Sequence, residues 1–209
     1  MVTQLGLFEA IMDILYLKPL FIFGLVLIGL LAFWLLKKDK KQPNLRIVIG
    51  SILMFYYLCI VFKNIVGIPT INELFGLSHL GESFFNPNIN LIPLDNGVSL
   101  EFILNIICFI PLGFLCPIIS KTHEQIKKVV LFGSGISLMI EISQLFTLYR
   151  ATDINDLIAN VLGTVIGYLS FKLFVILGVI KSSSPLEKDS TRFMPTLIVI
   201  FAYAITFIS

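Results

Sequence analysis

The sequence predicts an all-α, polytopic transmembrane helical bundle of about six spans with an N-terminal interfacial helix. Of its 209 residues, 57% are hydrophobic and only 13% are charged, which is about half the charged fraction of a typical soluble domain. Apolar stretches near the length of a membrane span recur along the chain, and the connections between them alternate between rich and poor in lysine. Lipid is therefore the expected solvent.

The expected elements follow one another along the chain with little room for a soluble domain. In residues 1–18, Glu9 and Asp13 interrupt spaced apolar residues, a pattern typical of an amphipathic helix at the membrane interface. A membrane domain is expected over 19–180, a cytoplasmic linker over 181–193 and a last transmembrane helix over 194–209. The expected spans are 19–36, 45–62, 100–119, 129–148, 157–179 and 194–208.

Positive charge predicts the orientation of these spans. The basic connections hold eleven Lys and Arg residues, five in 37–46, three in 120–128 and three in 181–192. The alternate connections hold few, because 63–99 has only Lys63 and 149–156 has only Arg150. Lys and Arg near span ends are retained in the cytoplasm. We therefore expect a multi-pass protein of the cell membrane with both termini outside the cytoplasm.

Charged groups inside or beside spans are costly, about 2.5–3.5 kcal/mol each, and usually face other helices or water. Glu141 is expected near the middle of a span, with Gln144 on the same helix face. Asp153 is expected to cap the next helix, with Asp156 in its first turn. Arg150 is the natural counter-ion for these carboxylates, because a guanidinium group matches their geometry.

These polar groups come from three consecutive spans toward one side of the membrane, which favours a binding site. The expected ligand-binding residues are Asn105, Glu141, Gln144, Arg150, Asp153, Asp156 and Asn160. A structural alternative stays open, in which Asp153 is an ordinary cap and Glu141 with Arg150 forms a buried ion pair that only fixes helix register. Close helix packing, with a kink at the proline, is expected at Pro111, Gly113, Gly163 and Gly167.

Several of these residues stand in an order that resembles the VanZ-like family. The matching elements are Asn90-Leu91-Ile92-Pro93, Asn105 with Phe109-Ile110-Pro111-Leu112-Gly113-Phe114, Glu141-x-x-Gln144, Arg150-x-x-Asp153-x-x-Asp156 and Asn160-x-x-Gly163-x-x-x-Gly167. The resemblance covers roughly residues 88–175, and Leu94 stands where the family commonly has an aromatic residue. It implies a cell-envelope protein of a Gram-positive bacterium that contributes to resistance to teicoplanin, as the founding member does.

The leading functional hypothesis is a binding or shielding protein rather than an enzyme. Its expected partners are membrane lipids, and a cell-wall lipid precursor or a lipoglycopeptide antibiotic at the outer leaflet; no nucleic acid is expected. The alternatives are an intramembrane enzyme acting on a lipid-linked substrate and a small transporter. No cofactor or metal is expected, although the carboxylates are oxygen ligands of the kind that suits a divalent cation. Residues 64–99 are either an interfacial flap or a simple connector, and no oligomeric state is predicted.

Overall fold

The computed structural model describes residues 19–38, 45–85, 87–94, 97–147, 150–181 and 189–209. These residues fold into seven α-helices with almost no strand, which confirms the predicted all-α fold. The predicted interfacial segment 1–18 lies outside the described residues.

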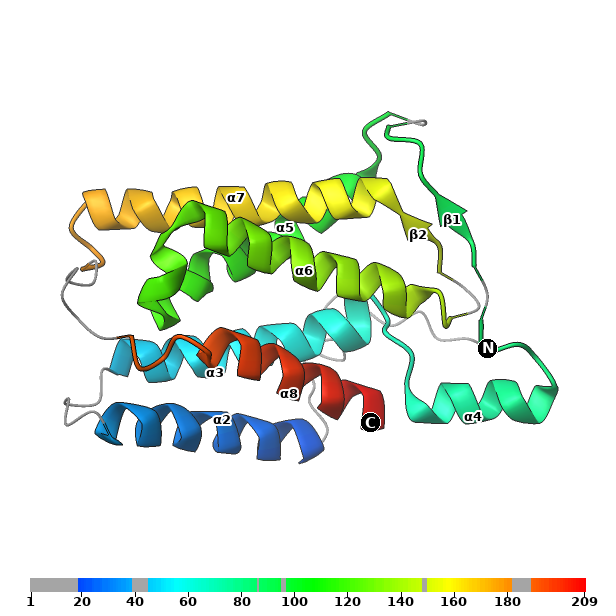
Figure 1. The fold of residues 1–209 in the computed structure, drawn as a ribbon, viewed down its shortest axis with the longest axis horizontal. Coiled ribbons are helices and arrows are strands. Elements are labelled where there is room, and N and C mark those ends of the chain that lie inside the picture. Colours follow the sequence, from blue (N-terminus) through cyan, green and yellow to red (C-terminus); the bar gives the residue numbers. More distant parts are fainter. Residues whose placement is uncertain (1–18, 39–44, 86, 95–96, 148–149, 182–188) are drawn as a thin grey trace, which may run out of the picture.

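Six of the helices form two layers (Figure 1). One layer consists of α5 (Leu100–Ile119), α6 (Ile126–Gln144) and α7 (Ile154–Ile176). The other consists of α2 (Pro19–Lys38), α3 (Leu45–Ile60), which continues into the π-helical turn η1 (Val61–Ile65), and α8 (Met194–Ile208). The contact between α5 and α7 is the most extensive in the described part of the chain, and α3 joins the layers by packing on α5.

Four helices are long and apolar enough to cross a membrane: α2, α3 with η1, α5 and α7. The 19-residue α6 carries Lys127, Lys128 and Glu141, which lowers its hydropathy. The 15 residues of α8 extend about 22 Å, less than the roughly 30 Å of a bilayer core. The chain is therefore a membrane protein, whereas the count of six spans stays a prediction.

Helix ends differ from the predicted spans in two places. Helices α6 and α7 each begin three residues earlier than expected. Helix α6 ends at Gln144, where the Thr147 hydroxyl donates a hydrogen bond to the Gln144 carbonyl oxygen (2.8 Å), and Asp153 caps α7. Glu141 consequently lies in the last turn of α6, and its predicted position in the middle of a span was wrong.

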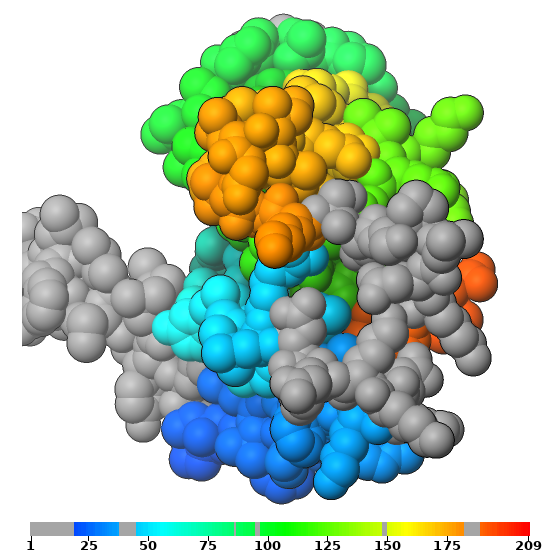
Figure 2. All heavy atoms as spheres, turned by 90° about the vertical axis from the view of Figure 1, so that its left-hand side faces the viewer, coloured from blue at the N-terminus to red at the C-terminus, as the bar shows by residue number. Residues whose placement is uncertain are grey.

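The helix ends beside the three basic stretches of the sequence lie at one end of the bundle. Helices α2, α5 and α7 end at the left in Figure 1, where α3, α6 and α8 begin, and we call this the basic end. Figure 2, viewed from that end, shows α2 and α7 on opposite sides of the molecule with α3 between them. The Arg46 guanidinium donates a hydrogen bond to the Lys181 carbonyl oxygen here (2.7 Å). The described helix ends beside the basic stretches therefore share one end of the fold.

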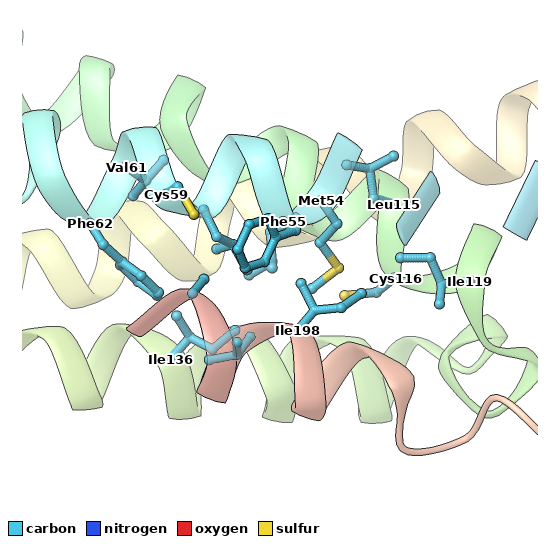
Figure 3. Close-up of a cluster of buried hydrophobic side chains, with 14 of the residues drawn as sticks. Met54, Phe55, Cys59, Val61, Phe62, Leu115, Cys116, Ile119, Ile136 and Ile198 are labelled. Atoms are coloured by element: carbon cyan, nitrogen blue, oxygen red, sulfur yellow. The ribbon is translucent and has the colours of Figure 1, made fainter. Parts of the chain in front are cut away.

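A hydrophobic core joins the two layers between α3, α5, α6 and α8 (Figure 3). Phe55 and Phe62 of α3 and η1 are completely buried in it, as is Ile198 of α8. Cys59 and Cys116 are free thiols inside the same cluster. They pack as small apolar residues among the larger side chains.

The segment between α3 and α5 contains a helix that the sequence interpretation missed. Helix α4 (Ile71–Leu80) begins with a capping box, in which Thr70 and Glu73 bond reciprocally to each other's backbone N–H. Figure 1 shows α4 beyond the end of α3, at the end of the bundle opposite the basic end. We call this the α4 end.

Candidate functional site

A short parallel pairing of strands closes the α4 end. Strand β1 (Ile89–Asn90) pairs with β2 (Thr152–Asp153), and the Thr152 N–H donates to the Asn88 carbonyl oxygen (2.8 Å). The pairing joins the segment before α5 to the start of α7. It brings the Asn90 side chain next to the cap of α7, a proximity that the sequence interpretation did not include.

Glu141 is bonded to the strand that precedes α7. Its Oε2 accepts a hydrogen bond from the Asp153 N–H (2.9 Å), and its carbonyl oxygen accepts one from the Thr152 hydroxyl (2.9 Å). The Gln144 amide oxygen and nitrogen can be assigned in two ways. In one its nitrogen donates to the Val66 carbonyl oxygen (3.4 Å), and in the other it donates to Glu141 Oε2 (3.2 Å) and the Ala151 carbonyl oxygen (3.3 Å). The second orientation satisfies more polar atoms.

One oxygen of the Glu141 carboxyl group has no hydrogen-bond donor among the residues that the structure describes. The side chain is only 4% exposed, and no described residue donates a hydrogen bond to its Oε1. A buried carboxyl oxygen that lacks a donor is costly. Glu141 therefore combines a structural bond to β2 with an unused acceptor inside the protein.

The two aspartates at the start of α7 are each bonded to an asparagine from before or within α5. Asp153 caps α7 by accepting from the Asn155 N–H (2.8 Å), and its other oxygen accepts from the Asn90 side chain (3.2 Å). Asp156 accepts from the Asn105 side chain at 2.6 Å. These charge-assisted hydrogen bonds fasten α5 to the start of α7.

The loop after β1 is fastened to the same helix start. The Leu94 N–H donates to the Asn155 side-chain oxygen (2.7 Å), and Leu94 has a φ of 55°. The Ile92 N–H donates to the Asn90 side-chain oxygen (3.2 Å), which forms a local turn. The Asn90-to-Pro93 motif thus shapes a loop that covers the N-terminus of α7.

Arg150 makes its hydrogen bond to backbone and not to the predicted carboxylates. It forms no ion pair with Glu141, Asp153 or Asp156, and instead its guanidinium donates to the Ile65 carbonyl oxygen (3.0 Å). The guanidinium also lies over Gly67, which has a φ of 61°. The expected pairing of Arg150 with the carboxylates is therefore absent, because the α6–α7 connection directs this side chain toward the end of α3.

A cavity of about 370 Å³ lies beside Arg150. Helix α4 contributes Glu73, Gly76, Leu77 and Leu80 to its wall, and the α6–α7 connection contributes Phe146, Thr147 and Arg150. The cavity volume falls within the range typical of small-molecule sites. Its wall combines a cation and a carboxylate with several apolar side chains.

Asn160 lies one turn further along α7 and belongs to a separate contact. Its side-chain nitrogen donates to the Ser137 hydroxyl of α6 (2.9 Å), while its Oδ1 is buried and has no partner among the described residues. The Thr164 hydroxyl donates to the Asn160 carbonyl oxygen (2.9 Å). Asn160 thus links α7 to α6 and does not reach the cavity beside Arg150.

Three glycines lie where α5 and α7 approach most closely. A Cβ atom on Gly163 or Gly167 would overlap the carbonyl oxygen of Ile106 or Ile110, and one on Gly113 would overlap the Thr164 carbonyl oxygen. Only glycine permits such backbone contact. Helix α5 continues through Pro111 without interruption.

The structure divides the predicted site residues into four groups. Glu141, Gln144 and Asp153 form a hydrogen-bonded network with β1 and β2, and Asn105 with Asp156 forms a separate bonded pair. Arg150 lines the cavity, and Asn160 lies between α6 and α7. Asn90, Thr152, Asn155 and α4 were missed. The Thr-x-x-Glu pattern at Thr70 was the available sign of α4. Among the described residues, no group of three or more His, Cys, Asp and Glu side chains is arranged to hold a metal ion.

Comparison with known proteins places this fold in a family. The model of the VanZ/LLP1 family matches residues 20–177, from the start of α2 to the end of α7. The chain is also similar to Protein VanZ of Enterococcus faecium, with 37% identity over 105 residues. That alignment covers 48% of this chain and 63% of VanZ, so the chain spans less than two thirds of this relative. No solved structure matches the chain. With three quarters of its length matched by the family model, the chain belongs to the VanZ/LLP1 family.

Proposed function

We propose that this membrane protein contributes to resistance against teicoplanin-type lipoglycopeptides by binding an acylated ligand at its α4 end. The ligand is either the antibiotic itself or an envelope lipid that the antibiotic approaches. Family membership and the similarity to VanZ support the resistance role. The helix ends beside the basic stretches lie at the opposite end, which supports an α4 end that faces outward, because Lys and Arg are retained on the cytoplasmic side.

The observation that carries the proposal is the cavity beside Arg150. Its guanidinium offers a cation, while Leu77, Leu80 and Phe146 offer an apolar wall. An amphiphile with an anionic group and an acyl chain matches both properties, since guanidinium binds carboxylate or phosphate and the chain gains from burial. Four of the nine described lining residues belong to α4, the helix that lies outside the two layers.

The carboxylate network has a supporting role in this proposal. Glu141 bonds to β2 immediately after the connection that carries Arg150, and Asp153 and Asp156 bond to asparagines of the preceding segment. These bonds hold the α6–α7 connection against the start of α5. Arg150 contacts the ligand, and the network positions Arg150.

Drug susceptibility in a sensitive Gram-positive host tests the resistance role. Cells expressing the wild-type chain should tolerate teicoplanin better than cells without it, with little change for vancomycin, which lacks the acyl chain. Arg150→Gln should lose the protection. Arg46→Gln is the matched control, because it removes the same charge and a similar bond to a carbonyl oxygen at the basic end. Membrane levels of each protein must be equal.

Filling the cavity tests the site without altering its charge. Gly76 lines the cavity, and a Cβ there meets no other atom within 4 Å, so Gly76→Leu should occupy the cavity and reduce protection. Ser78→Leu places the same side chain on another face of α4 and should not reduce protection. Equal effects of Arg150→Gln and Arg46→Gln, or full protection with Gly76→Leu, would reject this site; no protection by the wild type would reject the resistance role.

A further inference from the structure

A second cavity, of about 570 Å³, lies between α6 and α8 toward the basic end. The two helices are linked near the α4 end, where the Ser143 and Tyr203 hydroxyls are 2.8 Å apart, and few of their backbone positions approach each other closely. Figure 1 shows α6 and α8 in different layers on the near face of the molecule. The space between the layers is thus left open on this flank.

The walls of this cavity are apolar and one end is cationic. Lys128, Arg192 and His123 line the end nearest the connections, and none of the described lining residues is acidic. The remaining wall consists mostly of apolar side chains: Leu131, Phe132, Ile136, Met139, Val199 and Ile200. Burial lowers the pKa of His123 despite the nearby Asp189 carboxylate, which leaves Lys128 and Arg192 as the charges that face the cavity.

Asp189 fixes the shape of the cationic end without contributing to its lining. Its carboxylate accepts hydrogen bonds from the Ser120 hydroxyl (2.9 Å), the Thr122 N–H (2.6 Å) and the Thr191 N–H (3.2 Å). These bonds connect the α5–α6 turn, which carries Thr122 and His123, to the segment that carries Arg192. The two cationic residues are therefore held on either side of one opening.

Gly135 provides the space for an apolar chain. It lies on the α6 wall of the cavity, and a Cβ atom built on it meets nothing within 4 Å. Glycine in a helix interior is unfavourable by about 1 kcal/mol relative to alanine. Here, unlike at Gly163, no neighbouring backbone accounts for the glycine.

We propose that this cavity binds an anionic phospholipid of the leaflet at the basic end. The phosphate lies between Lys128 and Arg192, and one acyl chain runs over Gly135 between α6 and α8. Basic pockets between transmembrane helices characteristically bind such headgroups. The site lies at the opposite end of the bundle from the cavity beside Arg150, so it does not depend on the proposed resistance role.

Lipid binding to the full chain in detergent, followed by native mass spectrometry, tests the proposal. Phosphatidylglycerol should bind roughly 25-fold more tightly than phosphatidylcholine, since each of the two cations contributes about fivefold. Lys128→Gln and Arg192→Gln should each weaken phosphatidylglycerol binding about fivefold and leave phosphatidylcholine unchanged. Lys127→Gln is the matched control, because Lys127 is the adjacent residue and does not line the cavity.

Gly135→Leu tests the acyl-chain position. It should reduce the binding of both lipids, whereas Leu138→Phe, which adds bulk to an exposed α6 residue outside the cavity, should not. Equal binding of the two lipids by the wild type would overturn the proposal, as would equal losses in the Lys127 and Lys128 variants. Unchanged binding by Gly135→Leu would overturn the path of the chain. If that variant does not fold, the comparison of Lys128→Gln with Lys127→Gln still tests whether the cavity binds the headgroup.

Discussion

The same substitution, glycine to alanine, should have different effects at two positions of the bundle. On Gly163 of α7, an added Cβ overlaps the Ile106 carbonyl oxygen and lies 3.0 Å from the Phe109 Cβ. On Gly135 of α6, it meets nothing within 4 Å. Gly163→Ala should therefore destabilise the protein, and Gly135→Ala should be neutral or slightly stabilising.

The expected magnitude follows from what the Cβ meets. Overpacking a tight contact typically costs about 1–3 kcal/mol of stability. The cost at Gly163 should lie at the upper end of this range, because the overlapped Ile106 carbonyl oxygen is a backbone atom that moves only with the whole helix. Gly135→Ala should gain up to about 1 kcal/mol from helix propensity. The difference between the two variants is then about 3–4 kcal/mol, from these two effects.

Reversible unfolding in mixed detergent micelles, followed by circular dichroism, measures this difference. Gly167→Ala should resemble Gly163→Ala, because its Cβ overlaps the Ile110 carbonyl oxygen. The double variant should cost less than the sum, since the first substitution already separates α5 from α7. Equal stability of the Gly163 and Gly135 variants would refute the backbone contact between α5 and α7.

Three further outcomes are expected. A double-mutant cycle of Asn105→Leu and Asp156→Leu, read by the same unfolding assay, should give a coupling energy of about 2 kcal/mol, because their hydrogen bond of 2.6 Å involves a charged acceptor; additivity would argue against it. Hydrogen bonds from Thr122, Ser120 and Thr191 lower the pKa of Asp189 even though burial alone would raise it, so its stabilisation is present above the ordinary pKa near 4 and lost as pH falls below that value. Wild type should lose more stability than Asp189→Asn over that range. Thr70→Ala should speed hydrogen exchange in α4 alone, since loss of the cap costs the helix about 1 kcal/mol; unchanged exchange would refute the capping role.

The bundle was predictable because membrane insertion depends on local properties of the chain. Apolar stretches placed α5 and α8 at the residues where the structure has them, and charge alternation placed the helix ends beside three basic stretches at one end. Helix boundaries were less well predicted where polar residues decide them. Thr147 ends α6 and Asp153 begins α7, so both helices are shifted toward the N-terminus and Glu141 moves from mid-span to the last turn.

The sequence indicated which polar residues to consider for the candidate site, but it did not predict the contacts between them. Asp153 as a cap was foreseeable from an Asx residue before an apolar helix. Two contacts were not foreseeable. Asn105 bonds to Asp156, 51 residues away, and Arg150 bonds to the Ile65 carbonyl oxygen and not to a carboxylate. The ligand-binding role of these residues stays a prediction.

The sequence alone determined the membrane character of the chain, the course of most helices and the end at which positive charge gathers, because hydropathy and charge act residue by residue. Only the tertiary structure decided which polar groups meet, that Arg150 borders a cavity with α4, and that α6 and α8 leave an open space. These features depend on distances between helices far apart in the chain. Local patterns along the chain carry no direct information about such distances.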